Sequence, residues 1–211
     1  MKRFWHDNAL TIVLMLLFLL FWTAQALSGW AVHNQELQDA HQHLLTLGAY
    51  LRSAHFWSAT AENWESEFLQ MAAFVVLTVY LRQRGSAESK PYPEEETQED
   101  REQEKRDSQV KGFWQRNSLS LVLFALFGAS MLTHLLNSWK DYNLAEMAQG
   151  KTAETLGQFL HEPEFWFESF QNWQSEFLAV ATIVALTIFL RQIGSSQSKG
   201  LTEPNRKTGD A

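Results

Sequence analysis

The sequence predicts an all-α integral membrane protein with four transmembrane helices, arranged as two tandem parallel helical-hairpin repeats with outer interfacial helices. Long charge-free runs, an internal repeat and the segregation of basic residues predict it. No Asp, Glu, Lys or Arg occurs in residues 8–35 or 117–139. Uncharged apolar runs of about 18 or more residues are typical of membrane-spanning helices. The mean hydropathy of −0.25 hides these runs because the charged residues lie between them.

The internal repeat relates residues 1–90 to residues 110–199 without a gap, with about 35 of the 90 positions identical. Residues 63–69 (NWESEFL), for example, recur as residues 172–178 (NWQSEFL). The N-terminal segment resembles a cleavable signal peptide, but it recurs in mid-chain, where no signal peptide acts. The predicted organisation is a first two-helix membrane repeat (1–90), an acidic cytoplasmic linker (91–109), a second two-helix membrane repeat (110–199) and a disordered tail (200–211).

The predicted helices follow from the apolar runs of each repeat. The first and third cover about residues 9–30 and 118–139, and the second and fourth centre on residues 68–81 and 177–190. The segments between them, about 31–62 and 140–171, are too long for tight hairpins. Apolar residues at helical spacing predict a short interfacial helix in the first of them. Gly48 and Gly157 suit the C-terminal ends of these short helices.

The distribution of Lys and Arg predicts the orientation. The basic residues gather beside the linker and the two termini, which places both termini in the cytoplasm. Eight of the nine tryptophans then fall at predicted membrane boundaries, as their amphipathic rings favour. The acidic linker has no apolar face to bury and is predicted to be solvated.

A polar stripe on the second and fourth helices is the predicted binding site. Fourteen residues separate Glu67 from Arg82, which is about 21 Å of helix and less than a hydrocarbon core of about 30 Å. Lipid cannot satisfy polar groups, so the stripe should face the other helices, where intramembrane carboxylates are functional candidates. The candidate cluster contains Asn63, Glu67, Thr78, Arg82, His134, Asn172, Glu176, Thr187 and Arg191. The alternative is that these groups only hold the helices together.

The predicted function is a non-enzymatic membrane protein whose outer intramembrane carboxylate cluster binds a partner or an ion. One alternative is a small ion or proton transporter or channel that acts as an oligomer. Another is a metal-dependent membrane enzyme that uses the histidines of the first outer segment, which are His33, His41, His43 and His55. The expected partners are the lipid bilayer and a second copy or another membrane protein, with no nucleic acid and no cofactor. The chain has no cysteine and therefore no disulfide or thiolate metal site.

Several segments resemble an uncharacterised bacterial membrane protein family, domain of unknown function 6766. These segments are the helix starts at residues 8–11 and 117–120, the block at residues 62–71 (ENWESEFLQM) and the residues 85–90 that end the first repeat. The second repeat departs from the block at Gln171, Gln174, Ala179 and Val180. The resemblance covers nearly the whole chain and implies a multi-pass protein of the bacterial cytoplasmic (inner) membrane, without implying an activity.

Overall fold

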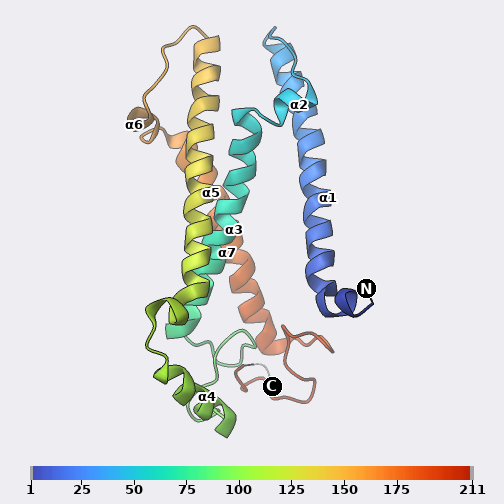
Figure 1. Ribbon diagram of the computed structural model, residues 1–211, viewed down its shortest axis with the longest axis vertical. Coiled ribbons are helices and arrows are strands. Elements are labelled where there is room, and N and C mark those ends of the chain that lie inside the picture. Colours follow the sequence, from blue (N-terminus) through green and yellow to red (C-terminus); the bar gives the residue numbers. More distant parts are fainter. Residues whose placement is uncertain (1, 210–211) are drawn as a thin grey trace. The chain divides into compact units, whose positions relative to one another are not determined.

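The computed structural model describes residues 2–209, with side chains from residue 4 on, and all regular secondary structure in that range is helical (Figure 1). The predicted all-α class is confirmed. The helices are α1 (Lys2–Asp39), α2 (Leu47–Tyr50), α3 (Ala54–Tyr80), α4 (Gln98–Gln109), α5 (Phe113–Ala148), α6 (Leu156–Phe159) and α7 (Pro163–Phe189).

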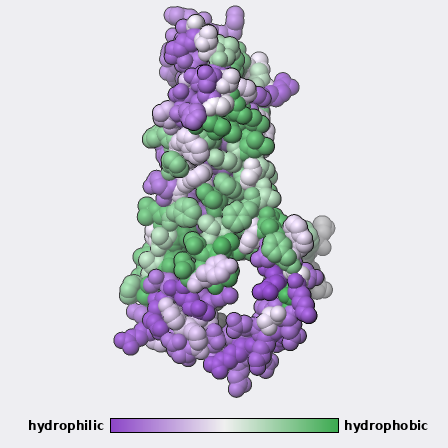
Figure 2. All heavy atoms as spheres, turned by 90° about the vertical axis from the view of Figure 1, so that its left-hand side faces the viewer, coloured by the Kyte–Doolittle hydropathy of each residue, from purple (hydrophilic) through white to green (hydrophobic). Residues whose placement is uncertain are grey.

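Three of these helices are long and apolar enough to cross a membrane, namely α1 over Phe4–Asp39, α5 over Phe113–Ala148 and α7 over Pro163–Phe189. Helix α3 has the same length as α7, 27 residues, but is less apolar, in part because it has Gln70 and Tyr80 where α7 has Ala179 and Phe189. Figure 2 shows hydrophobic residues over the middle of the face in view and hydrophilic residues at the end that carries α4. By length and composition, α1, α5 and α7 therefore have the character of membrane-spanning helices.

Two compact units divide the chain: residues up to 60 together with 136–153 form unit 1, and residues 61–135 together with those from 154 on form unit 2. Each unit combines parts of both halves of the sequence. The division passes through α3 and α5, so each of these helices contributes side chains to both units.

In unit 1, α2 is anchored to α1 by hydrogen bonds. The Asn34 side chain donates to the Leu45 carbonyl (2.9 Å) and accepts from the Leu45 amide (2.7 Å), and the Trp30 indole donates to the same carbonyl (2.7 Å). The Thr46 hydroxyl caps the N-terminus of α2. Gly48 lies inside the single turn of α2, and Gly157 lies inside α6 in the same way. The prediction that these glycines end the short outer helices is therefore wrong.

In unit 2, the acidic linker contains the exposed helix α4. Thr97 and Asp100 form a capping box at its start, and none of its residues is buried. The Lys199 ammonium is 2% exposed and donates to the backbone carbonyls of Gly85, Asn205 (3.2 Å) and Lys207 (2.8 Å). The segment after α7, predicted to be disordered from residue 200 on, thus lies against the loop that follows α3.

Candidate functional site

The most deeply buried ionisable groups of unit 2 are His134 on α5 and Glu65 on α3, both with 0% exposure. A carboxylate faces each nitrogen of the His134 ring. Nε2 lies 3.2 Å from Oε2 of Glu168 on α7, and Nδ1 lies 3.2 Å from Oε2 of Glu65. The imidazole is therefore held between carboxylates that come from two other helices.

Helix α7 positions the Glu65 carboxylate. Its Oε1 accepts hydrogen bonds from the Ser169 hydroxyl (2.9 Å) and the Trp173 indole (3.3 Å), which lie one helical turn apart. Its Oε2 lies close to His134 but forms no hydrogen bond with any described residue. The contact between Glu65 Oε2 and His134 Nδ1 is thus electrostatic, and both atoms are buried.

A third carboxylate, Glu62, lies one turn before Glu65 on α3 and is half-buried. The Asn172 side-chain amide donates a hydrogen bond to its Oε1. Glu62, His134 and Glu168 each offer one ligand atom, and these atoms all lie within 4.8 Å of one another. The buried Phe165 ring packs against the imidazole with 5.0 Å between ring centroids. We call Glu62, Glu65, His134 and Glu168 the closed cluster.

The closed cluster carries more negative than positive charge. An imidazole with a carboxylate at each nitrogen is best satisfied as an imidazolium, because both nitrogens then donate. Three carboxylates and one imidazolium together carry a net charge of −2. Uncompensated charge away from water costs several kcal/mol per ion, so the cluster attracts protons or a metal cation. Imidazole and carboxylate together suit Zn²⁺, Fe²⁺ or Mn²⁺.

Two residues of the sequence-predicted stripe belong to this region: His134 is its centre and Asn172 holds Glu62. Glu67 and Asn63, also on α3, are exposed, and Glu176 on α7 is partly exposed. The structure therefore brings His134 together with Glu62 and Glu65. These two residues belong to the same block, residues 62–71, as Glu67 but lie on a different face of α3. The predicted role of Glu67 and Glu176 stays a prediction.

Of the four remaining residues of the predicted site, the two on or next to α3 form hydrogen bonds with nearby backbone carbonyls. The Thr78 hydroxyl donates to the Phe74 and Val75 carbonyls, and the Arg82 guanidinium donates to the Pro91 carbonyl. The other two stripe residues make contacts across unit 2. Thr187 is buried and shares a 3.1 Å hydrogen bond with the Ser86 hydroxyl, while Arg191 donates to backbone carbonyls of α7 and to Asn205. The predicted role of these four residues in binding stays a prediction.

Sequence reasoning missed Glu62, Glu65 and Glu168. One available signal is the position of small residues on α3: Ala61 and Ala72 lie four positions before and seven positions after Glu65, and all three residues are buried. A second signal is divergence between the aligned halves. Gln171 and Gln174 stand where the first half has Glu62 and Glu65, and Gln25 stands where the second half has His134.

These features define a helical protein with helices long and apolar enough to cross a membrane, and with a cluster of ionisable groups contributed by α3, α5 and α7. The chain belongs to the family described as Domain of unknown function (DUF6766), whose model matches residues 1–210. The family resemblance expected from the sequence is thereby confirmed. No curated protein and no solved structure matches the chain.

Proposed function

We propose that this chain is a non-enzymatic membrane protein that binds a cation at the closed cluster. In this proposal α3 is a fourth span, both termini are cytoplasmic, and the membrane is the inner membrane of a bacterium. At 1.5 Å per residue the 27 residues of α3 extend about 40 Å, which is long enough to span.

The proposal includes a duplicated two-helix unit. The bounds of α6 and α7 follow those of α2 and α3 after 109 positions, the same offset that aligns the two halves of the sequence. The caps agree as well, since Thr46 precedes α2 and Thr155 precedes α6 in the same conformation. The recurring bounds support an origin by duplication of a two-helix unit.

The observation that carries the cation site is the fully buried His134 with carboxylates at both ring nitrogens. Without a metal, the imidazolium donates a hydrogen bond from Nε2 to Glu168 and faces Glu65 with the proton on Nδ1. With a metal, Glu62, His134 and Glu168 would hold the ion, and Glu65 would keep the proton on Nδ1 of His134. A carboxylate behind a histidine ligand in this way fixes the tautomer and strengthens the ligand. Metal binding therefore displaces a proton from Nε2 of His134.

The test is calorimetry with Zn²⁺ and Mn²⁺ on the full chain in detergent, in two buffers that differ in ionisation enthalpy. We expect proton release on binding, and at least a tenfold loss of affinity at this site in Glu62→Gln and Glu168→Gln. Glu67→Gln is the matched control, because Glu67 lies on the same helix as Glu62 but is exposed. Equal binding by all three variants would overturn the proposal.

A further inference from the structure

Unit 1 contains a second group of ionisable side chains, whose composition differs from that of the closed cluster. The His33 and His55 rings, from α1 and α3, stack with 4.2 Å between centroids and 22° between planes. Nδ1 of His55 lies 2.8 Å from Oδ2 of Asp141 on α5, and Nδ1 of His33 lies 3.5 Å from Oε2 of Glu36. We call His33, Glu36, His55 and Asp141 the open cluster.

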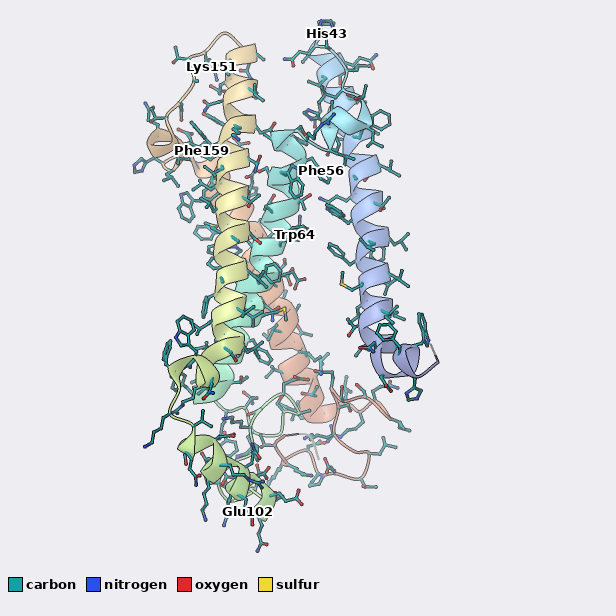
Figure 3. The ribbon with its side chains drawn as sticks, in the orientation of Figure 1. His43, Phe56, Trp64, Glu102, Lys151 and Phe159 are labelled. Atoms are coloured by element: carbon teal, nitrogen blue, oxygen red, sulfur yellow. The ribbon has the colours of Figure 1, made fainter. Side chains whose placement is uncertain are left out.

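The local fold of unit 1 holds the two rings together. Tyr50 is 3% exposed and packs against both, with ring centroids 5.8 Å from His33 and 6.1 Å from His55. Gly29 makes room for it, because a side chain at position 29 would collide with the Tyr50 hydroxyl. Phe56, which follows His55 and is labelled in Figure 3, is also buried and contacts the Tyr50 ring.

The contacts of the open cluster favour neutral imidazoles, in which one ring nitrogen keeps a lone pair that can bind a metal ion. Asp141 accepts from Nδ1 of His55, which directs the ring's lone pair to Nε2. Nδ1 of His33 is buried and has no hydrogen-bond partner among the described residues. Two stacked rings 4.2 Å apart repel if both are protonated. A metal ion relieves the unsatisfied nitrogen and keeps both rings neutral.

We propose that His33, Glu36 and His55 bind one transition-metal ion, Zn²⁺ or Cu²⁺, with Asp141 orienting His55. These three side chains offer ligand atoms that all lie within 4.8 Å of one another. Two imidazoles and one carboxylate are a known three-ligand set for zinc, and imidazole favours Zn²⁺ and Cu²⁺ over Mg²⁺ and Ca²⁺. The histidine side chains are 16% and 34% exposed and that of Glu36 is 61% exposed, so an ion reaches the site from solvent.

The site occurs once per chain. At the positions aligned with His33, Glu36 and His55, the second half of the sequence has Tyr142, Ala145 and Glu164. A single equivalent of metal is therefore expected here, independent of any ion at the closed cluster.

The test is Cu²⁺ binding to the full chain in detergent, followed by titration and by electron paramagnetic resonance. We expect one site with two nitrogen ligands, which the spectrum distinguishes from Cu²⁺ at the closed cluster, where His134 offers a single nitrogen. His33→Gln and His55→Gln each weaken it at least tenfold and remove one nitrogen from the spectrum. The controls are His41→Gln and His43→Gln, because both histidines are exposed in the loop after α1, where Figure 3 labels His43. Glu62→Gln leaves the two-nitrogen spectrum unchanged, which separates this site from the closed cluster.

Two further variants keep the test decisive if a histidine variant unfolds. Glu36→Gln replaces a mostly exposed side chain and should still weaken Cu²⁺ binding. Asp141→Asn should weaken it about 10- to 100-fold without removing a nitrogen from the spectrum, as expected of a group that orients a ligand. Binding that is unchanged in His33→Gln and Glu36→Gln, or that is lost equally in His43→Gln, would overturn the proposal.

Discussion

The closed cluster and the open cluster both consist of histidines and carboxylates, but they differ in the ratio of carboxylates to histidines. In the closed cluster one histidine is surrounded by three carboxylates, and His134 and Glu65 are fully buried. In the open cluster two stacked histidines share two carboxylates, and every member is partly exposed. An excess of carboxylate around a buried imidazole favours an imidazolium, whereas paired imidazoles near solvent favour a metal ligand.

The burial difference also sets what each cluster contributes to folding. Water screens the half-exposed His55–Asp141 pair, and such pairs contribute at most about 1 kcal/mol. A fully buried pair has no such screening, so removing one partner leaves the other uncompensated. The two clusters therefore predict different costs for similar substitutions.

The largest expected effect is that of Glu65→Ala. It removes the carboxylate at Nδ1 of His134 and leaves the Ser169 hydroxyl and Trp173 indole without their acceptor. We expect a loss of about 3–5 kcal/mol in the free energy of unfolding. Asp141→Ala, its counterpart in the open cluster, should lose about 1 kcal/mol or less. Unfolding in mixed detergents measures both, and equal costs would remove the distinction between the clusters.

The next effect comes from converting the closed cluster to the residues of the opposite half, with Glu62→Gln, Glu65→Gln and His134→Gln combined. The aligned residues are Gln171, Gln174 and Gln25. The triple variant removes both fully buried ionisable groups and leaves Glu168, whose side chain is 32% exposed, as the charge of the cluster. It should therefore regain stability, by about 1–4 kcal/mol relative to Glu65→Ala. It should also lose cation binding at the closed cluster. A triple variant less stable than Glu65→Ala would mean that packing, not charge, governs this region.

A smaller effect is expected from Gly29→Ala in unit 1. The added methyl group would collide with the Tyr50 hydroxyl and displace the ring that supports His33 and His55. Overpacking of this kind costs about 1–3 kcal/mol. Tyr50→Phe removes the hydroxyl and should restore both stability and Cu²⁺ binding in the double variant. Failure of this rescue would show that the contact does not hold the open cluster.

The smallest effect concerns alkaline pH. Burial raises the pKa of the Tyr50 phenol above its usual value of 10, and the negative charges of Asp141 and Glu36 raise it further. A folded-state pKa above the unfolded one contributes stability at neutral pH, and this contribution is lost as pH rises above about 10. Phenolate absorbance should show one tyrosine that ionises late and is absent in Tyr50→Phe. An unchanged titration curve in that variant would contradict the assignment.

The sequence predicted the helical class and the positions of the long apolar helices, because charge-free runs determine both. It did not predict their bounds, since α1 and α5 begin before and end after the predicted ranges 9–30 and 118–139. It did not predict which face of α3 is buried. The polar spacing favours the stripe that contains Glu67 and Arg82 as the inner face, but both residues are exposed, and the small residues Ala61 and Ala72 lie on the buried face with Glu65. The spacing of polar residues does not decide which face of α3 is buried, because polar residues recur at helical spacing on both faces and the rotation of the helix about its axis is set by its neighbours.

The open cluster was only partly predictable for a related reason. The sequence shows four histidines in the first outer segment, but which two meet depends on how α2 turns against α1. The orientation of α2 against α1 depends on two hydrogen bonds between the Asn34 side chain and the Leu45 backbone, and on the space that Gly29 leaves for Tyr50. Neither has a sequence pattern that identifies it, and Asp141 comes from a helix about 86 residues further along the chain.

The most direct test of the account is the protonation state of His134 in the metal-free protein. Nitrogen-15 magnetic resonance of labelled histidine, assigned with His134→Gln, distinguishes an imidazolium from either neutral tautomer. The account predicts protons on both ring nitrogens at neutral pH, and loss of the Nε2 proton when Zn²⁺ is added. A neutral ring in the metal-free protein that does not change with Zn²⁺ would contradict it.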